Sequence, residues 1–347
     1  MKAKKKSYLK NISKIREKRS ISPSIDELCD GIFKSDKVAL ARAITLIEST
    51  LPQHLKKADA IIEKCVEKEN TSIRIGITGV PGVGKSTFIE AFGKQLTAMG
   101  EKVAVLAVDP SSTQTKGSIL GDKTRMQDLV KDANAFIRPS PSGVSLGGVT
   151  RKTRESIILC EAAGYTIILI ETVGVGQSET AVHSMVDFFL VLKLPGAGDE
   201  LQGIKRGIIE MADAIVINKA DGNSIEKANI AKMEFTRALQ LYPPKENGWY
   251  PKVLTCSAIE NDGLNDIWTM ISNYVAKNKK DNVFQLKRQQ QNKNWLLQSL
   301  DDQLKMHFYQ NDAVKPVLKD MIQEVIEAKI SPFKAAEKLL SLYHNSK

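Results

Sequence analysis

Residues that build disulfide frameworks and zinc sites are scarce in this sequence. Its 347 residues include 4 cysteines and 4 histidines. The cysteines lie far apart with no Cys-x-x-Cys pair, and the histidines form no cluster of possible ligands. We therefore expect neither a disulfide framework nor a structural zinc site, and a reducing, cytoplasmic setting fits the chain best.

Long apolar runs are missing as well. No uninterrupted apolar stretch approaches the roughly 20 residues that are needed to cross a bilayer. The N-terminus also lacks the apolar core of a secretory signal and the Arg- and Ser-rich pattern of an organelle presequence. The chain is therefore expected to be soluble, with no membrane partner.

Positive charge is concentrated at the N-terminal end. The formal net charge is +10, and residues 2–19 hold nine basic residues against one acid, Glu17, which amounts to +8. Because the rest of the chain is nearly neutral, a broad phosphate-binding face is not expected, and neither is a nucleic-acid partner. Residues 1–20 are interpreted as a flexible basic tail, and the cations between 279 and 293 as a solvated helix face.

The pattern of apolar residues divides the remaining chain into three segments. Residues 21–70 show helical periodicity. Within residues 71–278, short apolar runs alternate with helical stretches, which predicts an α/β fold: a mostly parallel sheet with helices on both faces. Residues 279–347 are polar and helical, with an apolar stripe but too few apolar residues for a separate core. We expect this segment to pack on the main domain or on another subunit, and we predict a homodimer. The expected strands are 73–78, 103–108, 166–170, 188–192, 214–217 and 253–256.

A complete phosphate-binding loop follows the first expected strand. The pattern Gly-x-x-x-x-Gly-Lys-Ser stands between that strand and a helix that continues to about Met99, which is the context in which the motif is specific. Its backbone N–H groups and the helix N-terminus would hold the β-phosphate, Lys85 would reach the β- and γ-oxygens, and Ser86 would offer its hydroxyl to Mg²⁺. The alternative, a glycine-rich turn without chemistry, does not explain strand, motif and helix together. The nucleotide-binding residues predicted here are Gly79, Val80, Pro81, Gly82, Val83, Gly84, Lys85, Ser86 and Thr87.

Two further segments predict that the base is guanine. The expected strand 214–217 runs into Asn218-Lys219-Ala220-Asp221, the Asn-Lys-x-Asp signature of guanine-nucleotide-binding proteins. A carboxylate such as that of Asp221 accepts hydrogen bonds from guanine N1–H and the exocyclic amine, whereas adenine presents an acceptor at N1. Ser257-Ala258 resembles the element whose backbone N–H faces guanine O6. Taken alone, the tetrapeptide could be a turn with a helix cap. Because it follows the phosphate loop at a distance of about one domain, the two motifs together favour GTP over ATP.

Carboxylates after two strands are candidates for a Mg²⁺ site. Strand 166–170 runs into Glu171-Thr172-Val173-Gly174, where GTPases usually carry Asp-x-x-Gly. The Glu171 carboxylate can hold Mg²⁺, and the Gly174 N–H can sense the γ-phosphate. Two aspartates that follow strand 103–108 are further candidates, and each also has a structural interpretation as a turn or helix cap. The predicted metal-binding residues are Ser86, Asp109, Asp122 and Glu171.

The group that orients the attacking water is not where small regulatory GTPases have it. A glutamine usually follows the glycine of this motif, and here the position is Val175, with Gln177 and Glu179 further on. We therefore expect slow intrinsic hydrolysis, with a partner or a repositioned segment completing the site. From the sequence, Gln177 is included among the candidate catalytic residues.

With these motifs in place, the chain resembles the MeaB family, the G-protein chaperones of adenosylcobalamin-dependent acyl-CoA mutases such as methylmalonyl-CoA mutase. The resemblance covers most of the chain and rests on segments 79–87, 109–112, 121–126, 171–179, 194–205 and 218–221. It implies an N-terminal helical segment over 21–70, a P-loop GTPase domain over 71–278 and a C-terminal helical dimerisation arm over 279–347. It also implies that the protein hydrolyses GTP to protect, load or reactivate such a mutase.

The resemblance assigns roles that the residues alone leave open. Residues 195–205 resemble an additional switch that transmits the nucleotide state to the mutase, although local sequence alone fits a well-capped surface helix equally well. The mutases' cobalamin signature, Asp-x-His-x-x-Gly, is absent, so the expected cofactors are Mg²⁺ and GTP or GDP, with no cobalamin site in this chain. The Lys-rich N-terminus departs from the family pattern. The catalytic residues expected from motifs and resemblance together are Lys85, Glu171, Gly174, Gln177 and Lys205.

Two other function classes stay open at this stage. An ATP-dependent kinase or ATPase associated with amino-acid transport is the main alternative, although the sequence shows no dedicated acceptor site for a kinase. A nucleic-acid-linked GTPase would use the basic tail and the cations between 279 and 293. The sequence does not identify which acyl-CoA mutase would be the partner.

Overall fold

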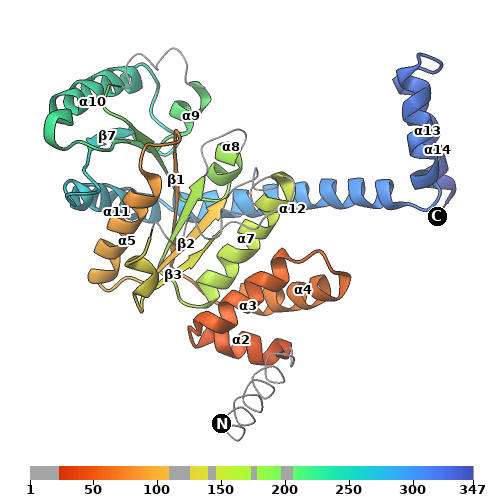
Figure 1. The fold of residues 1–347 in the computed structure, drawn as a ribbon, viewed down its shortest axis with the longest axis horizontal. Coiled ribbons are helices and arrows are strands. Elements are labelled where there is room, and N and C mark those ends of the chain that lie inside the picture. Colours follow the sequence, from red (N-terminus) through yellow and green to blue (C-terminus); the bar gives the residue numbers. More distant parts are fainter. Residues whose placement is uncertain (1–22, 109–125, 140–145, 173–177, 197–205, 347) are drawn as a thin grey trace, which may run out of the picture. The chain divides into compact units, whose positions relative to one another are not determined.

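The computed structural model describes residues 23–108, 126–139, 146–172, 178–196 and 206–346. The chain divides into two compact units, Met1–Phe284 (unit 1) and Gln285–Lys347 (unit 2). Unit 1 contains the sheet and the helices that cover it, and unit 2 is helical (Figure 1).

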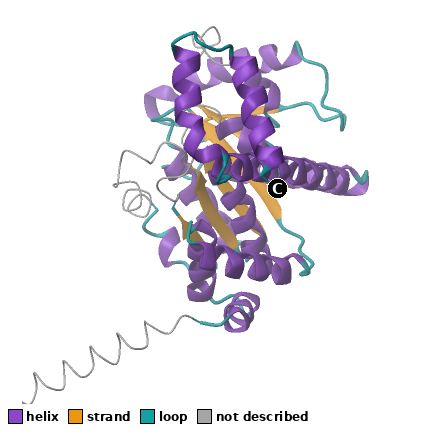
Figure 2. Ribbon diagram, turned by 90° about the vertical axis from the view of Figure 1, so that its right-hand side faces the viewer, coloured by secondary structure: helices purple, strands orange, loops and turns teal. Residues whose placement is uncertain are grey.

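A parallel sheet forms the centre of unit 1. In the part of the chain that the structure describes, it has seven strands in the order β3-β2-β4-β1-β5-β6-β7. β1 lies between β4 and β5, with Ile75 opposite Leu169 on one side and Phe188 on the other. A parallel sheet must be covered on both faces, and helices flank the strands in Figure 2. The strands are β1 (Ile73–Gly79), β2 (Val103–Val108), β3 (Ala135–Arg138), β4 (Ile167–Thr172), β5 (Phe188–Lys193), β6 (Ala214–Ile217) and β7 (Lys252–Thr255).

Alternate residues of each strand enter two separate hydrophobic cores. In β4, Ile168 and Ile170 belong to the first core, and Ile167 and Leu169 belong to the second. Every residue of β4 and β5 is buried, which is why these central strands read as nearly continuous apolar runs in the sequence. The first core is covered by α2 (Ile25–Phe33), α3 (Lys37–Glu48), α4 (Pro52–Val66), α7 (Leu146–Ala162), α8 (Ser178–His183), α9 (Arg206–Met211) and α10 (Ile225–Gln240). The second core is covered by α5 (Lys85–Ala98), the 3₁₀ turn η1 (Leu129–Lys131) and α11 (Leu264–Lys280). A second 3₁₀ turn, η3 (Gly222–Ser224), precedes α10.

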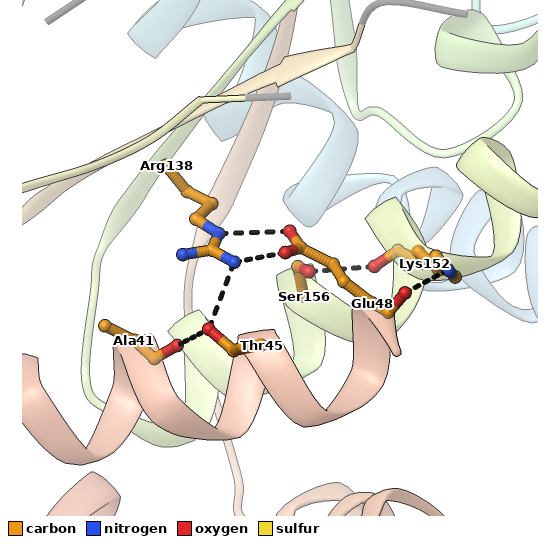
Figure 3. A network of polar contacts seen from close by, with 6 residues as sticks. All are labelled: Ala41, Thr45, Glu48, Arg138, Lys152 and Ser156. Carbon is orange, nitrogen blue, oxygen red and sulfur yellow. Dashed lines mark hydrogen bonds and ion pairs between the residues drawn. The ribbon is translucent and has the colours of Figure 1, made fainter. Parts of the chain in front are cut away.

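The N-terminal helices are fastened to the rest of unit 1 through α7 and the end of β3. α2 begins with a capping box, in which the side chains of Ser24 and Glu27 each accept a hydrogen bond from the other's backbone N–H. At the end of α3, the Glu48 carboxylate accepts two hydrogen bonds from Arg138 of β3, and the one from Nε is 3.0 Å long (Figure 3). The Lys152 ammonium of α7 donates to the Glu48 carbonyl. Glu48 therefore joins three elements, and its ion pair with Arg138 is mostly shielded from water, with 14% and 23% of the two side chains exposed.

Unit 2 consists of most of α12 (Val283–Gln310), with α13 (Val314–Ile326) and α14 (Pro332–Asn345). The Ser331 hydroxyl caps α14 by accepting a hydrogen bond from the Lys334 N–H, and Pro332 occupies the first helical position. Unit 2 has a core of its own, so the expectation that this segment has too few apolar residues for one is wrong, although this core is small compared with the two cores of unit 1. The buried apolar side chains of this core are Val314, Met321, Ala335 and Leu339.

The structure confirms the α/β fold class with a parallel sheet and helices on both faces. Each of the six expected strands is present, with ends displaced by no more than two residues. The apolar pattern does not predict β3, because only three apolar residues precede the charged Arg138 in this strand. Within the described ranges, no helix has the length and apolarity required to span a membrane.

Gly76 marks a place where α8 approaches β1 too closely for a side chain. A Cβ added there would lie 2.9 Å from the Phe189 ring and 3.0 Å from Val182 of α8. We expect Gly76→Ala to lower the free energy of unfolding by about 1–3 kcal/mol through overpacking. Gly207→Ala on α9 is the matched control, because a Cβ at that position meets nothing within 4 Å. Urea denaturation measures both variants, and equal stability of the two would contradict this interpretation of the contact between α8 and β1.

Candidate functional site

The phosphate loop joins β1 to α5 at the carboxyl edge of the sheet. β1 ends at Gly79, and α5 begins at Lys85 with Gly84 as its N-cap. Gly82 and Gly84 adopt left-handed backbone conformations, with φ of +82° and +91°, which other residues rarely adopt. At Gly79, an added Cβ would lie 2.7 Å from the carbonyl oxygen of Leu192 on β5. Strand, left-handed turns and helix start together form the geometry in which backbone N–H groups bind phosphate.

Lys85 is a buried cation at the start of α5. It is 8% exposed, and its Nζ donates to the carbonyl oxygens of Gly79 at 2.8 Å and Val80 at 3.4 Å. Burial lowers the pKa of Lys85, while the negative charges of Glu171 and Glu179 act to raise it. A phosphate group in the loop would add negative charge that favours the ammonium form, so Lys85 is suited to bind anionic oxygens.

Ser86 and Glu171 bring two oxygen donors together beside the loop. The Ser86 Oγ lies 3.4 Å from the Glu171 Oε1, and Glu171 is buried at the carboxyl end of β4. The Thr172 hydroxyl donates to the Thr78 hydroxyl at 2.8 Å, so the ends of β4 and β1 are tied together. Hydroxyl and carboxylate oxygens are the ligands that Mg²⁺ prefers. The donors present here therefore fit this ion.

Asn218 connects the base-recognition segment to the phosphate loop. It is 1% exposed. Its Nδ2 donates to the Val83 carbonyl at 2.9 Å, and its Oδ1 accepts from the Ala258 N–H at 3.4 Å. The Lys219 ammonium adds a second link by donating to the Gly82 carbonyl at 2.8 Å. The ends of β6 and β7 are therefore held at a fixed distance from the loop, which is required for one nucleotide to be recognised at its phosphates and at its base.

Asp221 presents an oriented carboxylate at the same end of the sheet. The Ser257 hydroxyl donates to the Asp221 Oδ2 at 2.7 Å, and Ser257 itself is fully buried. The Ala220 N–H donates to the Cys256 carbonyl at 3.0 Å, which holds the two segments together along the backbone. A carboxylate fixed in this way can accept hydrogen bonds from guanine N1–H and the exocyclic amine.

The described residues that the sequence predicts for the site gather at the carboxyl edge of the sheet. They follow the ends of β1, β4, β6 and β7, where doubly wound α/β sheets bind their ligands. The other predicted residues lie outside the described residues, and their roles stay predictions. These are Asp109, Asp122, Gly174, Gln177 and Lys205.

The structure adds one residue to which the sequence analysis assigns no specific role. Glu179 is 4% exposed on α8 and is close enough to Lys85 to influence its pKa. The sequence offers one sign of this residue: Glu179 lies in the first turn of α8. Glutamate is common in the first turn of helices because it interacts favourably with the helix dipole. The burial of Glu179, which sets it apart from such residues, is seen only in the folded chain.

The class of protein follows from this arrangement: the chain is a P-loop GTPase. The model of the family described as Methylmalonyl Co-A mutase-associated GTPase MeaB matches residues 40–313. The chain belongs to this family.

Similar proteins come from bacteria and animals. The chain is 44% identical over 313 residues to GTPase ArgK of Escherichia coli, covering 90% of this chain and 93% of that protein. It is 44% identical over 329 residues to the mouse protein named methylmalonic aciduria type A homolog, mitochondrial, covering 92% and 79% respectively. A solved structure, of an LAO/AO transport system kinase, matches with a TM-score of 0.74 at 36% identity, covering 94% of this chain and 100% of that one.

Substitution of Lys85 tests the phosphate site. We expect Lys85→Ala to weaken GTP binding about a hundredfold or more, because hydrogen bonds to charged groups contribute about 1.5–3 kcal/mol each and Lys85 would form two. Lys94→Ala is the control, since Lys94 lies on the same helix with 52% of its side chain exposed. Isothermal titration calorimetry compares the two variants. If Lys85→Ala bound GTP as tightly as Lys94→Ala, the phosphate assignment would be wrong.

Proposed function

We propose that the chain binds GTP with Mg²⁺ and uses GTP hydrolysis to protect, load or reactivate an adenosylcobalamin-dependent acyl-CoA mutase of the methylmalonyl-CoA mutase type. The observation that carries the nucleotide part is the Asn218 side chain, which joins the phosphate loop to the base-recognition segment. Family membership supports the mutase as partner. The proposed nucleotide-binding residues are Gly79, Val80, Pro81, Gly82, Val83, Gly84, Lys85, Ser86, Thr87, Asn218, Lys219, Asp221, Ser257 and Ala258.

Recognition of guanine follows from the hydrogen-bonding capacity of Asp221. The carboxylate has only acceptors, so it pairs with the two donors on this edge of guanine. Adenine would place its N1 acceptor against the carboxylate and leave both groups without a donor, which is costly in a partly buried site. This selectivity supports a GTPase over the ATP-dependent kinase considered from the sequence.

Mg²⁺ would be held by the Ser86 hydroxyl and the Glu171 carboxylate, with Asp109 and Asp122 as proposed further ligands. When bound, the ion neutralises negative charge on the β- and γ-phosphate oxygens. Lys85 would exchange its contacts with the loop carbonyls for contacts with these oxygens. We assign cobalamin to the mutase and propose no site for it in this chain. We also propose a cytoplasmic location, because the four cysteines are free thiols, as expected in a reducing compartment.

Residues 195–205 are proposed to transmit the nucleotide state to the mutase. The chain enters this segment from β5, which pairs directly with β1, and Leu192 lies opposite Gly79 of the phosphate loop. The Lys193 carbonyl also accepts a hydrogen bond from the Asn218 N–H at 2.8 Å. The segment therefore begins beside both halves of the nucleotide site, where a change in the loop can reach it.

We further propose a homodimer formed through unit 2. Along α12, Leu297, Leu300 and Leu304 recur at intervals of three and four residues and are 52%, 47% and 62% exposed. This leucine stripe (Leu297, Leu300 and Leu304) would be stabilised by packing against an apolar surface. A second copy of the same helix offers a self-complementary surface of this kind.

Base selectivity is tested by Asp221→Asn. We expect GTP binding to weaken about thirtyfold or more, equivalent to about 2 kcal/mol, because the new amide donates where guanine also donates. Xanthosine triphosphate should gain affinity for the same variant, and this gain excludes general misfolding. Calorimetric titrations with GTP, ATP and xanthosine triphosphate measure the selectivity. Equal affinity of the unsubstituted protein for ATP and GTP would refute the guanine assignment.

The dimer is tested on the leucine stripe. Replacing Leu297, Leu300 and Leu304 by serine should give a monomer that still binds GTP, because the nucleotide site lies in unit 1. Leu241→Ser is the control, since Leu241 is an exposed leucine of unit 1 with 87% of its surface accessible. Light scattering distinguishes one 38.3 kDa subunit from two. A monomeric unsubstituted protein would contradict the proposal.

Coupling to the mutase is tested by single-turnover GTP hydrolysis with and without the cognate mutase. We expect slow hydrolysis alone and faster hydrolysis with the mutase, with Lys205→Ala losing the acceleration and Lys227→Ala on α10 keeping it. If the mutase favours the GTP-bound form, GTP must strengthen mutase binding by the same factor, typically about 5- to 150-fold. An unchanged rate with mutase would contradict the coupling, and a normal response of Lys205→Ala would remove Lys205 from it.

A further inference from the structure

Glu179 is a buried carboxylate beside the phosphate loop that none of the roles above uses. It is the second residue of α8 and is 4% exposed. In the described part of the chain, its Oε2 is buried without a hydrogen-bond partner. An ionised oxygen removed from water without a donor costs free energy, so a donor that arrives with a ligand would stabilise it.

Packing places α8 against the middle of β1. Val182 of α8 would lie 3.0 Å from a Cβ at Gly76 of β1, and β1 continues directly into the phosphate loop. The charge of Glu179 also influences Lys85, which begins the helix after the loop. Glu179 is therefore a buried carboxylate on a helix that packs against β1, and its charge acts on the lysine of the phosphate loop.

The chemistry of a carboxylate restricts what it can contact there. An ionised carboxylate accepts hydrogen bonds and donates none, so it repels the phosphate oxygens and requires a donor. Glu171 lies beside Ser86 on the proposed metal side, whereas no contact of Glu179 with Ser86 is present among the described residues. The water molecule that attacks a γ-phosphate in line with the leaving β–γ bridging oxygen is a donor of this kind.

We propose that Glu179 is a catalytic residue that accepts a hydrogen bond from the water molecule attacking the γ-phosphorus of GTP. This inference rests on the proposed GTPase site. Glu179 would orient the attacking water, a task for which small regulatory GTPases have a glutamine at the position of Val175. This assignment differs from the sequence-based candidate, Gln177.

The step balances without a further reactant. The water oxygen forms a bond to the γ-phosphorus, and the bond from that phosphorus to the β–γ bridging oxygen breaks. The electron pair of the broken bond stays on GDP, whose charge Lys85 would neutralise, together with Mg²⁺ when that ion is bound. The proton of the water passes to the Glu179 carboxylate and then to solvent, so the carboxylate is restored.

The test compares Glu179→Gln, Glu179→Asp and Glu155→Gln with the unsubstituted protein. Glu155 is the matched control, because it is a buried carboxylate on the neighbouring helix α7 that accepts a hydrogen bond from Arg151 at 2.7 Å. We expect Glu179→Gln to slow single-turnover GTP hydrolysis about a hundredfold or more, the usual range for a lost acid–base group. Glu179→Asp, which keeps the carboxylate but shortens its reach, should show an intermediate rate, and Glu155→Gln the normal rate.

Two further readouts separate catalysis from a structural role. GDP affinity of Glu179→Gln should stay within about threefold of normal, while formation of the complex with GDP and aluminium fluoride, which mimics the transferred phosphoryl group, should be lost. Its melting temperature without nucleotide should be equal or higher, because a buried charge without a donor has been removed.

A hydrolysis rate of Glu179→Gln within about threefold of normal would overturn the proposal. Parallel loss of GDP affinity and melting temperature would also overturn it, since that result indicates a structural role. If the unsubstituted protein bound no GTP, the proposed function itself would fail, and this outcome is distinct from an unaffected variant of an active enzyme.

Discussion

The hydrogen bonds of the Asn218 side chain are the interaction on which the nucleotide site depends. One amide donates to the Val83 carbonyl in the phosphate loop and accepts from the Ala258 N–H after β7. Three segments far apart in the sequence are thereby joined by direct hydrogen bonds. The same side chain limits the loop, because a Cβ at Gly84 would lie 2.8 Å from the Asn218 Nδ2. Glycine at this position is therefore required by its backbone conformation and by the base-recognition segment together.

The two edges of the sheet differ in how their buried charges are satisfied. At the amino edge, Arg74 donates two hydrogen bonds of 2.8 Å to Glu161, and its backbone N–H donates to Asp187. At the carboxyl edge, Lys85 is bonded to loop carbonyls, and Glu179 retains an oxygen that no donor of the described residues reaches. A bidentate ion pair stabilises a fixed structure, whereas incompletely satisfied charges are stabilised further when a ligand arrives. This asymmetry is the physical reason to place the chemistry at the carboxyl edge.

The N-terminal helices contact the carboxyl edge of the sheet through an ion pair. Arg138 stands at the carboxyl end of β3, next to β2, from which the chain continues toward Asp109. Its ion pair with Glu48 therefore connects α3 to the carboxyl end of β3 (Figure 3). Because α3 also packs on α7, the N-terminal segment forms part of unit 1 as a folded body. Unit 2 has its own small core instead.

Local sequence was sufficient for the main elements of this fold and for the motifs at its edge. The apolar runs of β4 and β5 and the glycine pattern around Lys85 depend on neighbours in the chain, so they can be read without the structure. The edge strand β3 shows no such pattern, because it contains three apolar residues followed by Arg138. The tertiary structure alone decided that Asn218 reaches Val83, that Glu48 pairs with Arg138 and that Glu179 is buried. Each of these depends on segments many residues apart coming together, and burial of a polar group is a property of the packed chain that composition and spacing do not encode.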